Sequence, residues 1–170
     1  MPNTPVKVKR KKWPRKVLGE LANFIEQFYP EGISLTDVAR DLDTTPQAIS
    51  NMFRRDDMKL SRAEEIAAKY GYELKLYYPV RKYEDGYQPP PPRRSYPNAG
   101  NLSGLLKYMQ DSDYSMNFVA ERSHLSTGVL TKAFEKGDIL LSTLYNILDN
   151  INLYVTWKYE KTDNKNNNTN

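Results

Sequence analysis

The sequence predicts a mainly α-helical protein with a small β component, built as two tandem four-helix units that are each followed by one β-strand. Three observations lead to this fold class. Apolar residues recur at helical spacing through most of residues 17–70. The pattern then repeats: Val38-Ala39 returns as Val119-Ala120, and this offset of 81 aligns residues 19–78 with residues 100–159 without a gap. Each copy ends in a short segment of alternating large apolar residues, as is typical of a strand.

The chain is expected to begin with a disordered basic arm, residues 1–16, which holds seven lysine and arginine residues and no acid. The whole chain has a net charge of only +4, so affinity for a polyanion must come from this arm and from local patches. The residues expected to contact phosphates are Lys7, Lys9, Arg10, Lys11 and Lys12. The alternative is a solvated terminus without a binding role; the helical unit that follows favours the first interpretation.

Residues 34–53 predict two short helices joined by a tight turn at residues 43–44. Ser34 and Thr45 are the predicted N-caps, and Pro46 falls at the first position of the second helix, where its missing N–H costs nothing. The residues expected to face inward are Leu35, Val38, Ala39, Leu42, Ile49, Met52 and Phe53. The small residue Ala39 lets the second helix cross close over the first.

Two further helices flank this pair and complete the first domain, residues 17–78. The helix before it has its apolar face at Leu18, Leu21, Phe24, Ile25 and Phe28. For the helix after it, residues 61–64 predict a second capping box and Gly71 a C-cap. The order of helix, helix-turn-helix and helix resembles the lambda-repressor-like (Xre-type) DNA-binding family. The residues that carry the resemblance are Leu35, Val38, Ala39, Thr44, Thr45, Gln47, Ile49 and Ser61.

The resemblance places the base-reading residues at the start of the second helix of the motif. The amide of Gln47 can offer a donor and an acceptor to the N7 and N6 edge of adenine, and Asn51, four residues on, can do the same. Ser50 is a weaker candidate. The residues expected to contact DNA phosphates are Ser34, Thr45, Arg54, Arg55, Lys59 and Arg62. The alternative is a solvated polar face, which any surface helix has.

A proline-rich linker, residues 79–98, is expected to join this domain to the second one, residues 99–160. In the second copy Gly128 stands at the position of Gln47 and has no side chain with which to read a base. The remaining base-reading candidates are Thr127, Thr131 and Lys132, and Lys136 is a phosphate candidate. This copy could bind another sequence, bind DNA non-specifically, or serve as a dimerisation or partner module. His124, the only histidine, is expected to be a polar turn residue.

The two strands, residues 72–78 and 153–159, are expected to pair antiparallel about a pseudo-twofold axis. A lone two-stranded ribbon is only marginally stable, so we expect its aromatic residues to pack on helices. If the strands paired across chains instead, the protein would be a homodimer with four motifs. The last ten residues, 161–170, are asparagine-rich and are expected to be a disordered tail.

Composition excludes several classes of function. The chain has no cysteine, which excludes disulfides and thiolate metal sites. No apolar run approaches the roughly 20 residues that a membrane helix needs. A secretory signal is also lacking, so a cytoplasmic, nucleoid-associated protein of a bacterium or phage is expected. No nucleophile motif, phosphate-binding glycine loop or zinc spacing occurs, so we expect no enzyme activity, no metal and no cofactor.

Together these features lead us to expect a sequence-specific transcriptional regulator that binds double-stranded DNA through tandem helix-turn-helix domains. The alternative is a protein-interaction module, antitoxin-like or a phage-encoded inhibitor, in which DNA binding is secondary or lost. Strand edges and aromatic faces would then bind a protein partner.

Overall fold

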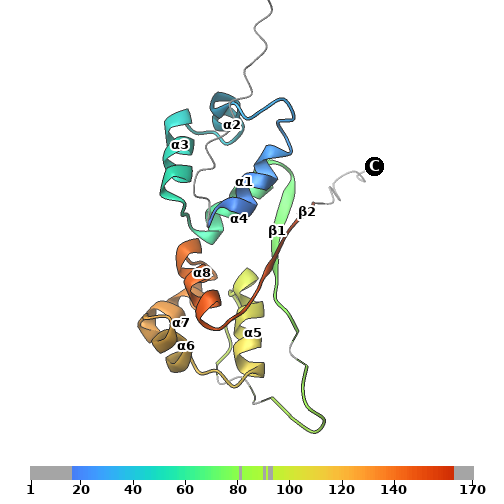
Figure 1. Cartoon of the computed structure of the whole chain (residues 1–170), viewed down its shortest axis with the longest axis vertical. Helices are drawn as coiled ribbons and strands as arrows, with labels where there is room; N and C mark the ends of the chain where they lie inside the picture. The colour runs from blue at the N-terminus through green and yellow to red at the C-terminus, as the bar shows by residue number, and fades with distance from the viewer. Residues whose placement is uncertain (1–16, 81, 90, 92–93, 163–170) are drawn as a thin grey trace, which may run out of the picture. The chain divides into compact units, whose positions relative to one another are not determined.

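The computed structural model describes residues 17–80, 82–89, 91 and 94–162 (Figure 1). Over these residues the chain is mainly helical with one two-stranded antiparallel sheet, which confirms the predicted fold class. The chain divides into two compact units, Met1–Met58 and Lys59–Asn170. The predicted basic arm and residues 163–170 of the predicted tail lie outside the described residues.

The first unit holds three helices, which are α1 (Gly19–Glu26), α2 (Leu35–Asp41) and α3 (Pro46–Arg55). Both predicted N-caps are confirmed: Ser34 Oγ accepts the Asp37 N–H at 3.4 Å, and Thr45 Oγ1 accepts the Ala48 N–H at 3.1 Å. The apolar faces of the three helices form the core, with Leu21, Phe24, Val38, Ala39, Ile49 and Phe53 buried. Met52 and Leu35, which were also expected to face inward, are half-buried.

Asp56 joins the two ends of this unit. It follows α3 in the left-handed conformation, at φ 51°. Its carboxylate accepts the backbone N–H groups of Val17 at 3.0 Å and Leu18 at 2.9 Å, just ahead of α1. The first N–H groups of a helix have no partner within the helix, so this carboxylate satisfies two donors at the start of α1.

The second unit starts with α4 (Leu60–Lys69) and β1 (Tyr72–Tyr77) and continues through a short 3₁₀ turn into four helices and a strand. These elements are η1 (Gly100–Leu102), α5 (Ser103–Asp111), α6 (Met116–Arg122), α7 (Thr127–Lys136), α8 (Leu141–Asn150) and β2 (Thr156–Lys161). Its core includes Leu60, Ile66, Leu102, Leu105, Leu130, Phe134, Leu141 and Ile147. None of the helices in the described part of the chain is long and apolar enough to cross a bilayer.

Three successive helices recur at a constant interval in residue number. The bounds of α6, α7 and α8 exceed those of α2, α3 and α4 by 81 at both ends. The residues with left-handed backbone keep the same interval, since Asp43 corresponds to His124 and Asp56 to Gly137. The first helix is different: α5 starts three residues later than the offset would place it, because η1 takes the first turn.

β1 and β2 run side by side and antiparallel, from Tyr72 opposite Lys161 to Tyr77 opposite Thr156 (Figure 1). This confirms the predicted pairing and places it within one chain. Leu76 lies opposite Trp157, and an isolated bridge joins Lys59 to Leu140; the members of each pair are 81 residues apart. In both pairings, residues separated by the offset of 81 therefore face one another.

The second strand begins later than predicted, at Thr156 rather than Leu153. Leu153 is buried, and its N–H bonds the Leu148 carbonyl at 2.9 Å, so the chain there still closes α8. At its other end β2 extends to Lys161 in order to pair with Tyr72. The aromatic residue Trp157 packs on α8, with its ring stacked on Tyr145 at 6.0 Å between centroids.

The predicted capping box at residues 61–64 is wrong. Helix α4 begins at Leu60, one residue before the predicted cap, and Ser61 lies inside its first turn. The N–H groups at the N-terminus of α4 are satisfied by residues elsewhere in the second unit. Asp138 accepts the Ser61 N–H at 2.9 Å and the Ser61 hydroxyl at 2.7 Å, while the Leu60 N–H bonds the Ile139 carbonyl at 2.8 Å.

Candidate nucleic-acid interface

The outward face of α3 carries the residues predicted to read bases. Gln47 is exposed, and Ser50 and Asn51 are half-buried. They are held outward because Ile49 and Phe53, on the opposite face of the helix, are buried in the core of the first unit. The second helix of the predicted motif therefore presents its amide side chains to solvent.

Side chains on this face are bonded to one another. Gln47 Nε2 donates to Asn51 Oδ1 at 3.1 Å, and Arg54 Nη2 donates to the same oxygen at 2.7 Å. Arg54, which was expected to contact phosphate, is thus also a partner of a base-reading candidate. Spacings of three and four residues bring side chains together on a helix, so this contact could have been found from the sequence.

The predicted phosphate contacts divide between the two units. In the first unit Arg55 is exposed at the end of α3, and Ser34 and Thr45 serve as N-caps. In the second unit, Lys59 is exposed and precedes α4. Arg62 forms a 2.8 Å ion pair with Glu65, one turn along the same helix, which offsets its charge. The five arm residues predicted to bind phosphate, Lys7, Lys9, Arg10, Lys11 and Lys12, lie outside the described residues.

The corresponding face of α7 is chemically different. The Thr127 hydroxyl donates to Asn117 Oδ1 at 2.8 Å, and the Thr131 hydroxyl donates to the Thr127 carbonyl at 3.0 Å. Both hydroxyl protons are therefore engaged within the unit, and each oxygen can offer only an acceptor to a ligand. Lys132 and Lys136 are exposed. Val129, which lies nearer the start of the helix, has 43% of its surface exposed.

The end of the predicted linker packs on α7, which the sequence did not predict. Arg94 Nη2 pairs with Glu135 Oε1 at 2.7 Å, and its guanidinium lies 5.2 Å from the centroid of the Tyr96 ring. The Tyr96 ring in turn lies 5.7 Å from that of Phe134. By the 81-residue offset, Glu135 stands on α7 where Arg54 stands on α3. The ion pair with Arg94 offsets the negative charge of Glu135.

His124 occupies the turn between α6 and α7, with φ 55°. This confirms the predicted turn position. Within the described residues, no group of three or more histidine, cysteine or acidic side chains could hold a metal ion.

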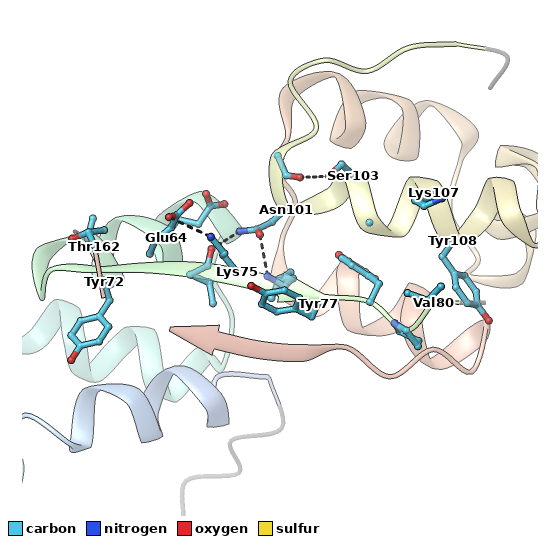
Figure 2. Close-up of a pocket in the computed structure, with 18 of the residues that line it drawn as sticks. Glu64, Tyr72, Lys75, Tyr77, Val80, Asn101, Ser103, Lys107, Tyr108 and Thr162 are labelled. Carbon is cyan, nitrogen blue, oxygen red and sulfur yellow. Dashed lines mark hydrogen bonds and ion pairs between the residues drawn. The ribbon is translucent and has the colours of Figure 1, made fainter. Parts of the chain in front are cut away.

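A groove of about 680 Å³ runs beside β1, between the strand and α5 (Figure 2). Asn101 occupies the middle of the strand's outer edge: its Nδ2 donates to the Leu74 carbonyl at 2.9 Å, and its Oδ1 accepts the Leu76 N–H at 3.1 Å. These are the bonds that a neighbouring strand would make. The side chain of Asn101 therefore satisfies the part of the edge where an added strand would pair.

Several ionisable groups line this groove, and burial raises the pKa of two of them, Tyr78 and Glu64. The buried hydroxyl of Tyr78 has no hydrogen-bond partner among the described residues, and its burial raises the pKa of the side chain. Burial also raises the pKa of the Glu64 carboxyl, and the negative charges of Asp138 and Glu73 raise it further. Lys75 and Lys107 also line the groove, together with Glu73 and Asp111, so it presents charges of both signs.

No family model matches the chain, and no solved structure matches it. Similar proteins include a UPF0122 protein of Desulforamulus reducens, which is 31% identical over 93 residues, or 52% of this chain and 80% of that protein. The repressor protein CI of Enterobacteria phage phi80 is 39% identical over 44 residues, or 26% of this chain and 19% of the repressor. Since the first match spans most of its relative, the chain belongs to the UPF0122 family.

Proposed function

We propose that this protein is a sequence-specific transcriptional regulator that binds double-stranded DNA. The observation that carries the proposal is the α2–α3 pair, in which both helices are capped and one face of α3 presents the exposed Gln47 and Arg54 and the half-buried Asn51. An exposed helix with amide and guanidinium side chains suits the donors and acceptors of the major groove. The similarity of 44 residues to a phage repressor supports the same function.

In this proposal affinity and specificity come from different groups. The side chains of α3 read base edges, while Arg55 and the basic arm at residues 1–16 neutralise phosphates. Binding of this kind releases counterions and weakens as salt rises. The regulator needs no cofactor and carries out no chemistry.

We further propose that the two copies of the repeat are tandem lambda-repressor-like domains with unequal roles. The constant offset of 81 between three pairs of helices supports a common origin. On α7, Gly128 offers no side chain and the threonine hydroxyl protons are engaged, so this copy contributes phosphate contacts through Lys132 and Lys136 more than base readout. Because β1 pairs with β2 in the same chain, one chain supplies both motifs without a homodimer.

The alternative is a protein-interaction module, for which the groove beside β1 would be the docking surface. Asn101 occupies the centre of that edge, so strand addition would first have to displace it. A stoichiometric protein that co-purifies with the chain, and that is lost when Val80 at the groove is changed to aspartate, would favour this alternative.

The proposal is tested by selecting duplexes from a randomised DNA library with the full-length chain. We expect one sequence to be enriched, and Gln47→Ala to weaken its binding by about 1–3 kcal/mol while relaxing the base preference. Gln88→Ala removes another exposed glutamine amide, from the linker, and should leave binding unchanged. A wild-type chain that enriches no sequence would show that the protein is not a sequence-specific regulator.

A further inference from the structure

Three side chains on the exposed face of α3 share one oxygen atom. Asn51 Oδ1 accepts a hydrogen bond from Gln47 Nε2 at 3.1 Å and another from Arg54 Nη2 at 2.7 Å. A carboxamide oxygen has two lone pairs, so these two donors use its capacity in full.

Arg54 determines which way both amides point. A guanidinium carries only donors, so Asn51 must turn its oxygen, not its nitrogen, toward Arg54. Gln47 approaches that same oxygen and must therefore present its nitrogen to it. Asn51 is left with Nδ2 as the group available to a ligand, and Gln47 is left with Oε1 and the second proton of Nε2.

This arrangement changes what each amide can recognise. To read adenine alone, an amide must donate to N7 and accept from N6. Asn51 has no acceptor to spare, so it cannot make that contact by itself. Asn51 Nδ2 and Gln47 Oε1 lie on one helix face, four residues apart, and together supply one donor and one acceptor.

We propose that Gln47 and Asn51 read a single adenine as one unit, with Arg54 as the positioning residue. This inference rests on the proposed DNA-binding function. Asn51 Nδ2 donates to N7 of the base, and Gln47 Oε1 accepts from its N6 amino group. Guanine is rejected because its O6 is an acceptor and would face Gln47 Oε1.

The combination of Gln47, Asn51 and Arg54 on α3 is not repeated on α7. The offset of 81 places Gly128, Lys132 and Glu135 at the three positions on α7, and none of these is a carboxamide. The inference therefore predicts one adenine of this kind in the binding site of each chain, not a symmetric pair.

The experiment uses the duplex that the full-length chain enriches from a randomised library, with the critical adenine replaced by 7-deazaadenine or by purine. The first analogue lacks N7 as an acceptor, and the second lacks the N6 amino group. We expect the wild-type chain to lose about five-fold or more in affinity with either analogue. Asn51→Ala should no longer distinguish adenine from 7-deazaadenine, and Gln47→Ala should no longer distinguish adenine from purine, at the same base pair.

Arg54 is tested by base discrimination, which a loss of phosphate contact alone would not change. Arg54→Ala should reduce the preference for adenine over both analogues, and Arg54→Lys, which keeps a donor for Asn51 Oδ1, should restore it. Arg55→Ala serves as the matched control, since it removes a neighbouring exposed guanidinium and should weaken all duplexes equally.

The failure of this inference is distinct from the failure of the proposed function. If Gln47→Ala and Asn51→Ala lose discrimination at two different base pairs, or if the preferred base is guanine, the joint reading of one adenine is wrong although the protein still binds DNA specifically. If the wild-type chain enriches no duplex, the proposed function itself is wrong.

Discussion

Removing the carboxylate of Asp138 should destabilise the second unit through the start of α4. This side chain accepts three hydrogen bonds, from the Ser61 N–H, the Ser61 hydroxyl and the Ile139 N–H, at 2.7–2.9 Å. Asp138→Ala leaves the Ser61 N–H without that partner, as the loss of an N-cap does. Losing an N-cap typically costs about 1 kcal/mol, within a range of 0.5–2.

A second interaction reduces this cost. The negative charge of Asp138 helps to raise the pKa of the half-buried Glu64, so its removal relieves a repulsion between two carboxylates. We therefore expect a loss of about 1 kcal/mol for Asp138→Ala and not the upper end of the range. Asp138→Asn keeps one oxygen for the two backbone N–H groups and also relieves the repulsion, so it should stay within about 0.5 kcal/mol of the wild type.

Urea unfolding of the three proteins, followed by far-UV circular dichroism, measures these differences as shifts of the midpoint at constant slope. Asp149→Ala is the control, because it removes an exposed carboxylate from α8 and should change stability by less than about 0.5 kcal/mol. Two results would contradict the inference that the Asp138 carboxylate stabilises the protein by capping α4. In one, Asp138→Ala is as stable as the wild type; in the other, Asp138→Asn loses as much stability as Asp138→Ala.

Three further changes test other parts of the structure. Asn101→Ala leaves the Leu74 carbonyl and the Leu76 N–H without their partner and should lower the free energy of unfolding in urea by about 1–3 kcal/mol. Asn117→Ala, which removes an exposed amide, should cost less. Equal losses would contradict the inference that Asn101 satisfies the edge of β1. Gly104→Ala places a Cβ 2.2 Å from the Tyr78 ring and should destabilise by about 1–3 kcal/mol, so an unchanged melting temperature would show that the ring moves freely. The raised pKa of Glu64 means that the folded state binds this proton more tightly than the unfolded state does, so stability falls as pH rises from the usual pKa of the carboxyl through the raised one. Glu64→Gln should therefore be more stable than the wild type at neutral pH and lose that part of the pH dependence, while Glu65→Gln should retain it.

Local patterns in the sequence predicted the local features of the fold. The caps at Ser34 and Thr45 were predictable because each bonds an N–H three residues along the chain. The start of α4 was not predictable from local spacing, because Asp138, which caps it, lies 77 residues away from Ser61. The strands were predicted from alternation, but the register of β2 follows from its pairing with β1, and alternation alone carries no information on that pairing.

In the candidate site, too, local spacing predicted some features and tertiary contacts determine the others. The helical spacing of Gln47 and Asn51 predicted a shared outward face, which the structure also gives them. The orientation of the two amides depends on a third side chain, Arg54, and the charge at Glu135 is offset by Arg94 from the linker. Such contacts depend on rotamers and on tertiary packing, which residue spacing does not specify.

The central claim is that the α3 face reads a base sequence. The direct measurement is the ratio of dissociation constants for a shuffled duplex and for the enriched duplex, both at the same salt concentration, for the wild type and for a Gln47→Ala, Asn51→Ala double variant. We predict a wild-type ratio on the order of 10³ or more that falls sharply in the double variant, while binding to the shuffled duplex is unchanged. A wild-type ratio near one, or a high ratio that survives in the double variant, would contradict the claim.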